Sequence, residues 1–286
     1  MAAERVGSER PVGTASASTP RRGAEVVAAV DGMHAGLAAV VWAADEADRL
    51  GQPLRLVHII EWPRTTDEVE PAEAAALSTE VLAEAAAQAH SVSPSVDVVM
   101  SSRWGRLGPT LLELATQPRT LVLGHRTMTG YASMVLGSVS VAVASRAAGP
   151  VVVVPETTSA WQRTSPPLVV VGTDDSPDAR RAVAYAFAYA SRHRFALEVV
   201  TAERAGPEVA AERADPEVTS IARTHPDVAW RARRVRSTPV EALTGSAADA
   251  SLLVVGGNRS CGQRSPVLGS VSRGVIFLAR CPVAVV

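Results

Sequence analysis

The sequence predicts an α/β protein built from two tandem domains, each with a parallel sheet flanked by helices. Its 286 residues are enough for two domains of about 140 residues each. Short apolar runs alternate with longer segments in which apolar residues recur at helical spacing, an order typical of parallel α/β sheets. A pattern of glycines also occurs twice. These three observations together indicate a duplicated α/β unit.

The duplication is visible when two segments, which begin "LVLGHRTMTG" and "LVVGGNRSCG", are laid over each other. One offset of 132 residues relates Gly124 to Gly256, Gly130 to Gly262, and Gly137-Ser138 to Gly269-Ser270. Upstream, Asp31 corresponds to Asp174 at an offset of 143 residues, so the second copy is 11 residues shorter between these motifs. A period this long indicates domain duplication and not a solenoid.

The elements of the first copy follow from local patterns. Short apolar runs predict buried strands at residues 25–30, 54–60, 96–101, 120–123 and 151–154. Helical spacing predicts helices at residues 35–50, 71–90, 108–116 and 137–147, the last beginning at the Gly-Ser pair. Gly51 follows the first helix and is expected to cap its C-terminus.

The second copy repeats this order of elements. Strands are expected at residues 168–171, 197–201, 228–234, 252–255 and 283–286. The basic run "WRARRVR" falls in the third of them, and we interpret it as a strand with one solvated face and not as a nucleic-acid site.

Composition sets the domain boundaries and excludes several classes of protein. Residues 1–22 are polar and lack an apolar signal segment, which predicts a disordered tail. Domains are expected at 23–155 and 167–286, joined by a Pro-rich polar linker at 156–166. No apolar run reaches the roughly 18 residues that span a bilayer. The net charge of −1 argues against a nucleic-acid partner, and the histidines show no metal-ligand spacing.

An acidic residue after strand one and a glycine loop after strand four are the motifs that resemble a known family. Copy one has Asp31 and then Gly124-x2-Thr127-x9-Gly137-Ser138. Copy two has Asp174 and then Gly256-x2-Arg259-x9-Gly269-Ser270. From residue 25 to residue 286, the chain resembles the universal stress protein family twice, in the tandem form of actinobacteria. The family pattern for the loop is Gly-x2-Gly-x9-Gly-Ser/Thr.

The resemblance implies two Rossmann-like (adenine nucleotide alpha hydrolase-like) domains, each with a five-stranded parallel sheet in the order 3-2-1-4-5. In such sheets a ligand lies beyond the carboxyl ends of strands one and four. Glycines allow close approach to an anion, and a helix N-terminus attracts phosphate. The implied ligand is ATP, with or without Mg²⁺. The implied cofactor-binding residues are Asp31, Ile59, Gly124, Thr127, Gly130, Gly137, Ser138 and Val139 in copy one, and Asp174, Gly256, Arg259, Gly262, Gly269, Ser270 and Val271 in copy two.

Both copies depart from the family pattern at the second glycine, which is Thr127 in one copy and Arg259 in the other. Arg259 is able either to contact a phosphate or to block the pocket. Copy two also has Asp175 where copy one has Gly32. A second carboxylate beside a polyphosphate is repulsive, so these residues favour the site of copy one. Asp31 and Asp174 also suit a simpler role as helix caps.

Three functions follow as hypotheses. The first, implied by the resemblance, is a cytoplasmic ATP-binding regulatory protein of the stress response with little or no turnover. The second is a protein-interaction module with decayed nucleotide sites, especially in domain 2, and its protein partners are unknown. The third is an enzyme, which the sequence supports least because it lacks a lysine-containing phosphate loop. A slow ATPase activity stays open.

The fifth strand of each copy is apolar and would be an exposed edge in isolation. By the resemblance, residues 151–154 and 283–286 are expected to pair antiparallel, which makes the chain an intrachain pseudo-dimer of domains. Further association into a homodimer is left open.

Overall fold

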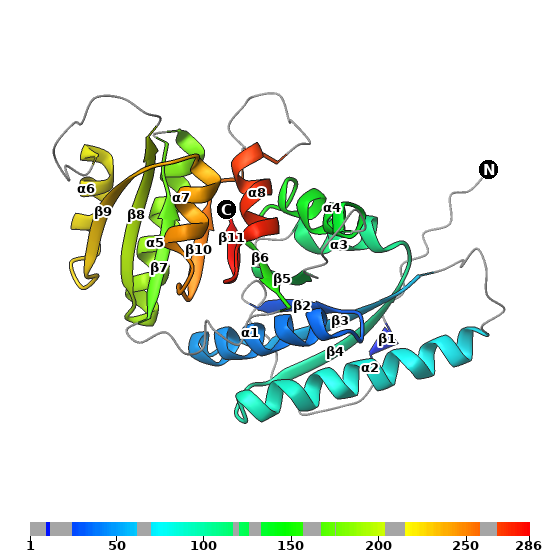
Figure 1. The fold of residues 1–286 in the computed structure, drawn as a ribbon. Helices are drawn as coiled ribbons and strands as arrows, with labels where there is room; N and C mark the ends of the chain where they lie inside the picture. Colours follow the sequence, from blue (N-terminus) through cyan, green and yellow to red (C-terminus); the bar gives the residue numbers. More distant parts are fainter. Residues whose placement is uncertain are drawn as a thin grey trace, which may run out of the picture. The chain divides into compact units, whose positions relative to one another are not determined.

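The computed structural model in Figure 1 describes residues 10–11, 25–61, 70–116, 120–125, 133–156, 167–174, 176–203, 215–257 and 268–286. The chain divides into two compact units. Unit 1 comprises Met1–His125 and Ala147–Gly149, and unit 2 comprises Arg126–Arg146 and Pro150–Val286. This division differs from the predicted domains because the last helix and strand of the first repeat are grouped with unit 2.

Unit 1 is a parallel sheet with helices, as predicted. Its strands lie in the order β4-β3-β2-β5, which is the expected order 3-2-1-4. A short strand, β1, pairs antiparallel with the outer edge of β4; it is the described part of the segment expected to be a disordered tail. The elements are β1 (Arg10–Pro11), β2 (Val26–Val30), α1 (His34–Leu50), β3 (Leu54–Ile60), α2 (Pro71–Val92), β4 (Val98–Trp104), α3 (Leu107–Ala115) and β5 (Thr120–His125).

Unit 2 contains the complete second repeat. Its strands β9-β8-β7-β10-β11 lie in the expected order 3-2-1-4-5. The elements are α4 (Ser133–Ala144), β6 (Val151–Pro155), β7 (Leu168–Gly172), α5 (Pro177–His193), β8 (Ala196–Glu203), α6 (Pro216–Arg223), β9 (Trp230–Arg236), α7 (Pro239–Ser246), β10 (Leu252–Val255), α8 (Ser270–Leu278) and β11 (Val283–Val285).

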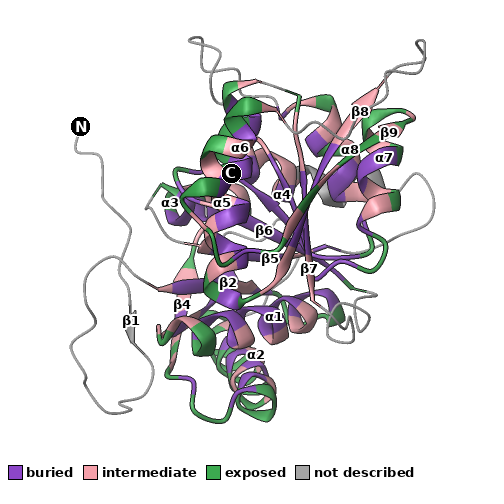
Figure 2. Ribbon diagram, turned by 90° about the vertical axis from the view of Figure 1, so that its left-hand side faces the viewer, coloured by how far each residue is buried: buried purple, intermediate pink, exposed green. Residues whose placement is uncertain are grey.

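The core consists of aliphatic strands covered by alanine-rich helix faces. Residues Val26, Val27 and Ala28 of β2 are fully buried, as are Val169, Val170 and Val171 of β7. In Figure 2 the central strands are drawn mostly in purple, for buried, whereas the outward faces of α2 and α6 are green. Among the described helices, none is long and apolar enough to cross a membrane.

Helix α1 ends where the sequence predicts. Gly51 has a φ of 59° in the left-handed region, and its N–H donates to the carbonyls of Ala47 and Asp48. A glycine tolerates this conformation without the steric penalty of a side chain. The predicted C-cap is therefore confirmed.

Helix α4 differs from the prediction. It begins at Ser133, whereas the sequence pattern placed its start at Gly137-Ser138. The intervening residues Met134, Val135 and Leu136 are apolar and compatible with a helix, and one glycine costs only about 1 kcal/mol within it. In the first repeat the Gly-Ser pair thus lies in the second turn of a helix. In the second repeat α8 begins at Ser270 with Gly269 as its N-cap, as predicted.

The fifth strands of the two repeats pair with each other. β11 runs antiparallel to β6, with Val283 opposite Val153, Ala284 opposite Val152 and Val285 opposite Val151. Every residue of β6 and β11 is buried. The antiparallel pairing predicted for these apolar edges is confirmed.

The first glycine of each loop is needed for close packing. A Cβ on Gly256 would lie 2.9 Å from the carbonyl oxygen of Asp178, in the first turn of α5. At the equivalent place in the first repeat, a Cβ on Gly124 would collide with the carbonyl oxygen of Ala35 in α1. Neither glycine has a positive φ. Each is required because the end of strand four touches the main chain of helix one.

This packing predicts the effect of adding a methyl group. We expect Gly256→Ala to lower the free energy of unfolding by about 1–3 kcal/mol, because the new methyl group would contact main-chain atoms of Asp178, which cannot move far. Gly245, in α7, has no heavy atom within 4 Å of its Cβ position, so Gly245→Ala should be neutral or stabilising by up to about 1 kcal/mol. Urea unfolding followed by circular dichroism measures both. Equal effects of the two substitutions would show that the close contact carries no energy.

Candidate functional site

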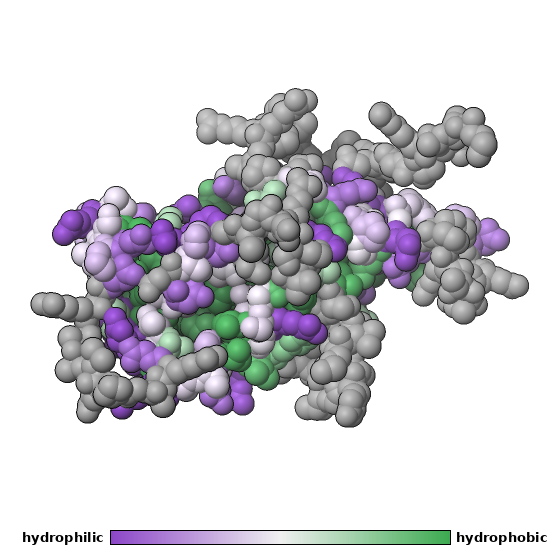
Figure 3. All heavy atoms as spheres, turned by 90° about the horizontal axis from the view of Figure 1, so that it is seen from above, coloured by the Kyte–Doolittle hydropathy of each residue, from purple (hydrophilic) through white to green (hydrophobic). Residues whose placement is uncertain are grey.

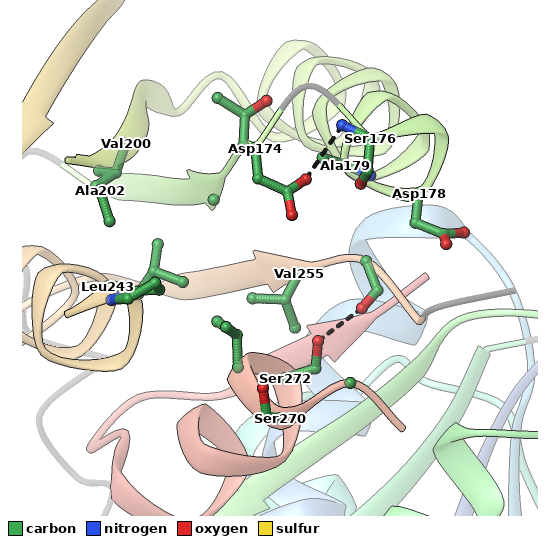
Figure 4. Close-up of a pocket in the computed structure, with 16 residues that line it drawn as sticks. Asp174, Ser176, Asp178, Ala179, Val200, Ala202, Leu243, Val255, Ser270 and Ser272 are labelled. Atoms are coloured by element: carbon green, nitrogen blue, oxygen red, sulfur yellow. Dashed lines mark hydrogen bonds between the residues drawn. The ribbon is translucent and has the colours of Figure 1, made fainter. Parts of the chain in front are cut away.

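A cavity of about 340 Å³ lies at the carboxyl ends of β7, β8 and β10, within the roughly 300–1,000 Å³ typical of small-molecule sites. Its lining comes from the turn between β7 and α5, from the ends of β8 and β10, and from the N-terminal parts of α7 and α8. Figure 4 shows Asp174 and Ser176 on one side of the cavity and Ser270 on the opposite side. Val200, Ala202 and Leu243 lie toward one end. This position is the crevice predicted for a ligand of such a sheet.

Most residues predicted for the second site line this cavity. They are Asp174, Gly256, Gly269, Ser270 and Val271. Arg259 and Gly262, predicted for the same site, lie outside the described residues, as does Asp175.

The residues predicted for the first site are distributed differently. Asp31, Ile59 and Gly124 belong to unit 1, whereas Gly137, Ser138 and Val139 lie in α4 of unit 2. Thr127 and Gly130 lie outside the described residues.

The strand registers identify the counterpart of Ile59. Ala29 lies opposite Val57 in unit 1, and Gly172 lies opposite Val200 in unit 2. Because Asp31 corresponds to Asp174, Val57 corresponds to Val200 and Ile59 to Ala202. Ile59 is buried, and the much smaller Ala202 lines the cavity. The second repeat therefore has more space where the first has a large side chain.

The helix N-termini around the cavity are not equivalent. The side chain of Ser176 caps α5 by accepting a hydrogen bond from the N–H of Ala179 at 3.1 Å. Thr238 caps α7 in a capping box with Glu241. Helix α8 has Gly269 as its N-cap, with no side-chain cap and no acidic residue in its first turn. Its first N–H groups have no acceptor within the helix, so α8 presents the positive end of its dipole to the cavity.

The two strand-one aspartates make the same local turn. Asp31 Oδ1 accepts a hydrogen bond from the N–H of Met33 at 3.0 Å, and Asp174 Oδ1 accepts one from the N–H of Ser176 at 3.2 Å. Each carboxylate bonds the main-chain N–H of the N-cap residue, Met33 or Ser176, so neither aspartate is itself the cap of helix one. Asp174 is also exposed and its carboxylate points toward the cavity in Figure 4.

The two aspartates differ in one neighbouring residue, which is Gly36 in the first repeat and Ala179 in the second. A Cβ on Gly36 would lie 2.7 Å from Asp31 Oδ1, so the carboxylate of Asp31 rests against the bare first turn of α1. Ala179 occupies the equivalent position in the second repeat and has that Cβ. Asp174 and Ala179 both line the cavity.

Ser272 is a site residue that the sequence reasoning did not single out. Its buried hydroxyl donates a 2.7 Å hydrogen bond to the carbonyl of Gly256, and Figure 4 draws this bond below Val255. The bond ties the first turn of α8 to the end of β10. The signal for it was the second serine of the phrase "LGSVS", which occurs in both repeats. Asp178, which also lines the cavity and pairs with Arg181, was missed as well.

Unit 1 contains a chain of polar side chains beside Asp31. His58 Nδ1 and Ser78 Oγ are hydrogen bonded at 2.8 Å, and Ser78 Oγ and Ser102 Oγ at 2.7 Å. Burial lowers the pKa of His58, and the negative charge of Asp31 partly opposes that effect. Burial also lowers the pKa of His125, at the end of β5. Both imidazoles are therefore held neutral at neutral pH.

The described residues contain no group of three or more His, Cys, Asp or Glu side chains arranged to hold a metal ion. The lining of the cavity can contribute the carboxylate of Asp174 to a metal ion.

Comparisons with known proteins agree with this architecture. The model of the Universal stress protein family matches residues 24–155 and 168–286. A universal stress protein of Mycobacterium tuberculosis is 30% identical over 294 residues, covering 94% of this chain and 98% of that protein. One from Mycolicibacterium smegmatis is 29% identical over 287 residues, covering 91% of this chain and 96% of that protein.

A solved structure shows the same fold. The crystal structure of a universal stress protein from Archaeoglobus fulgidus superposes with a TM-score of 0.69 at 18% identity, covering 91% of this chain and 95% of that one. A universal stress protein solved in complex with cAMP is 30% identical and covers 42% of this chain, with a TM-score of 0.32.

Removing the hydroxyl of Ser272 should loosen α8. Ser272→Ala leaves the Gly256 carbonyl without this donor, so we expect a loss of about 1–3 kcal/mol in the free energy of unfolding. Ser91→Ala, which removes an exposed hydroxyl bonded within α2, serves as control and should change stability by less than about 0.5 kcal/mol. Denaturant titration compares the two. A Ser272→Ala protein as stable as the control would rule out the tethering role.

The lowered pKa values of His58 and His125 predict a dependence of stability on pH. Below the ordinary histidine pKa of about 6.5, the unfolded chain takes up protons that the folded chain does not. The free energy of unfolding should therefore fall as pH decreases from about 7.5 to 5.5, above the range in which carboxyl groups titrate. Chemical unfolding at each pH measures the slope. In a double His58→Gln/His125→Gln variant, the free energy of unfolding should depend less steeply on pH. An unchanged dependence would contradict the conclusion that these two histidines cause it.

Proposed function

Because this chain belongs to the universal stress protein family, we propose that its second repeat binds an adenine nucleotide in the cavity between β7, β8 and β10. We propose further that the protein acts as a cytoplasmic, ATP-binding regulator of the stress response with little or no turnover. The observation that carries the proposal is the N-terminus of α8, which has no side-chain cap and faces a cavity of small-molecule size.

In this proposal the phosphates lie at the start of α8. The main-chain N–H groups of Ser270 and Val271 supply donors, and the Ser270 hydroxyl adds another. Gly269 allows the ligand to approach the main chain because it has no side chain. The other two helices that open onto the cavity, α5 and α7, are already capped by Ser176 and Thr238. An anion is therefore better stabilised at α8 than at either neighbour.

The sugar and base would extend from α8 across the cavity. The carboxylate of Asp174 suits the hydroxyl groups of a ribose, because it is exposed and accepts hydrogen bonds. Val200, Ala202 and Leu243 give apolar contact for a flat base. If Mg²⁺ accompanies the nucleotide, the phosphates would hold it together with water molecules and Asp174, since Mg²⁺ in nucleotide sites usually has only one or two protein carboxylates.

The proposal gives priority to the second repeat, whereas Arg259 and Asp175 had favoured the first. Two observations reverse the preference. Helix α4 begins at Ser133, so Gly137-Ser138 does not mark a helix N-terminus. The large side chain of Ile59 stands where the second repeat has Ala202. For the first repeat, the roles of Asp31, Ile59, Gly124, Thr127, Gly130, Gly137, Ser138 and Val139 stay predictions.

Filling the base end of the cavity tests the proposal. We expect isothermal titration calorimetry to detect ATP binding to the parent protein, with or without Mg²⁺. Ala202→Ile should weaken binding at least tenfold because the larger side chain occupies the space for the base. Ala229→Ile makes the same change at an exposed position and should leave affinity unchanged, while circular dichroism confirms that both variants fold.

The outcomes separate the hypotheses. No heat with ATP, ADP, AMP or cAMP would contradict nucleotide binding and favour the interaction module with decayed sites. GTP binding as tightly as ATP would contradict the preference for adenine. Binding that Ala202→Ile leaves unchanged would place the nucleotide elsewhere in the chain.

A further inference from the structure

Strand β9 lies at the outer edge of the sheet of unit 2. Within the described part of the chain it pairs with β8 alone, in parallel. Its sequence is Trp-Arg-Ala-Arg-Arg-Val-Arg over seven residues, without proline, so every residue carries an N–H. The outer side of this strand therefore presents main-chain donors and acceptors to any chain that can lie beside it.

The first repeat shows what such an edge can accept. β4 is the third strand of the first repeat, as β9 is of the second. The outer edge of β4 pairs antiparallel with β1, through Arg10 opposite Ser102 and Pro11 opposite Ser101. An added antiparallel strand thus fits the third strand of this fold, and β9 has the same place in its own sheet.

The side chains of β9 determine which strand can be added. Arg231, Arg233, Arg234 and Arg236 are all exposed, and Figure 3 shows hydrophilic residues in purple along the margin where β9 and α6 lie. Two carboxylates on β8 face these four guanidinium groups. Glu198 pairs with Arg231 and Arg233, and Glu203 pairs with Arg234. Among the described residues of β8 and β9, four arginines and two glutamates leave an excess of two positive charges.

The existing ion pairs hold the arginines in position without covering them. Glu198 is 1% exposed and accepts a 2.6 Å hydrogen bond from Arg231 Nε. The side chains of Arg231 and Arg233 nevertheless remain 71% and 53% exposed. A guanidinium has five donors, so each of these groups can bind a second carboxylate.

We propose that the outer edge of β9 binds an acidic, extended segment of a partner protein, which adds to the sheet as a further strand. In an extended chain alternate side chains share one face. Acidic residues at every second position therefore meet Arg231 and Arg233 on one face of the sheet, or Arg234 and Arg236 on the other. Main-chain hydrogen bonds provide affinity in this mode of recognition, and the charges select the partner.

Charge alone would also suit a nucleic acid, but the observations favour a peptide. The chain has a net charge of −1, and the local excess of positive charge is small compared with the many phosphate contacts of nucleic-acid proteins. An open strand edge is complementary to another polypeptide main chain. Arginines on an edge strand also repel basic strands and gain no compensating charge from uncharged ones, which makes the edge selective for acidic strands.

The experiment uses a fluorescein-labelled peptide of alternating glutamate and threonine, eight residues long, and the full chain. Fluorescence anisotropy in about 50 mM salt should show saturable binding that weakens at least tenfold at about 300 mM salt. Alternating lysine and threonine should not bind. Hydrogen exchange should show that the acidic peptide protects main-chain amides of β9.

Two double variants locate the contact. Arg234→Gln/Arg236→Gln removes two charges from β9 and should weaken peptide binding about tenfold. Arg192→Gln/Arg280→Gln removes two exposed charges outside β9 and should leave binding unchanged. The proposal is overturned if the lysine peptide binds equally well, if β9 gains no protection, or if a single-stranded oligonucleotide binds more tightly than the acidic peptide. None of these measurements depends on nucleotide binding.

Discussion

The contact between the end of strand four and the first turn of helix one is the constraint on which the rest of each repeat depends. Gly256 lies against the main chain of Asp178, and Gly124 lies against that of Ala35. Only a residue without a side chain permits this approach. Once β10 ends at that point, the hydroxyl of Ser272 can bond the Gly256 carbonyl and hold the first turn of α8 beside the cavity. The packing of one glycine thereby positions a helix N-terminus.

The two repeats share this framework but differ in what surrounds it. Ala202 replaces Ile59 and opens space at the end of β8, and the carboxylate of Asp174 lies at the cavity. Side chains cap α5 and α7, whereas α8 has none. The N-terminus of α8 therefore favours an anion at one wall of the cavity, and the carboxylate of Asp174 favours hydrogen-bond donors at the opposite wall. Duplication of a scaffold thus leaves each copy free to acquire its own local chemistry.

The edge strands differ in whether they are paired or exposed, and the difference follows from their residues. The wholly apolar β6 and β11 bury each other in an antiparallel pair. The outer edge of β4 is paired with a short segment of the N-terminal region. The edge of β9 carries arginines, which stay solvated while Glu198 anchors two of them. An apolar edge must be covered to avoid aggregation, whereas a charged edge can remain exposed and available to an acidic partner strand.

The sequence by itself determined the features that depend on local pattern or on internal repetition. These include the duplicated α/β scaffold, the C-cap at Gly51, the start of α8 at Gly269-Ser270 and the apolar strands that pair as β6 and β11. Tertiary structure alone decided the bond from Ser272 to Gly256, the close packing of Gly256 and the place of the cavity in the second repeat. Each of these depends on contacts between residues distant in the chain, or on the size of a side chain at a position that only the strand register identifies. The spacing of apolar residues shows which face of a helix or strand is buried, but not which atoms of another element that face contacts. The cavity is formed by those contacts.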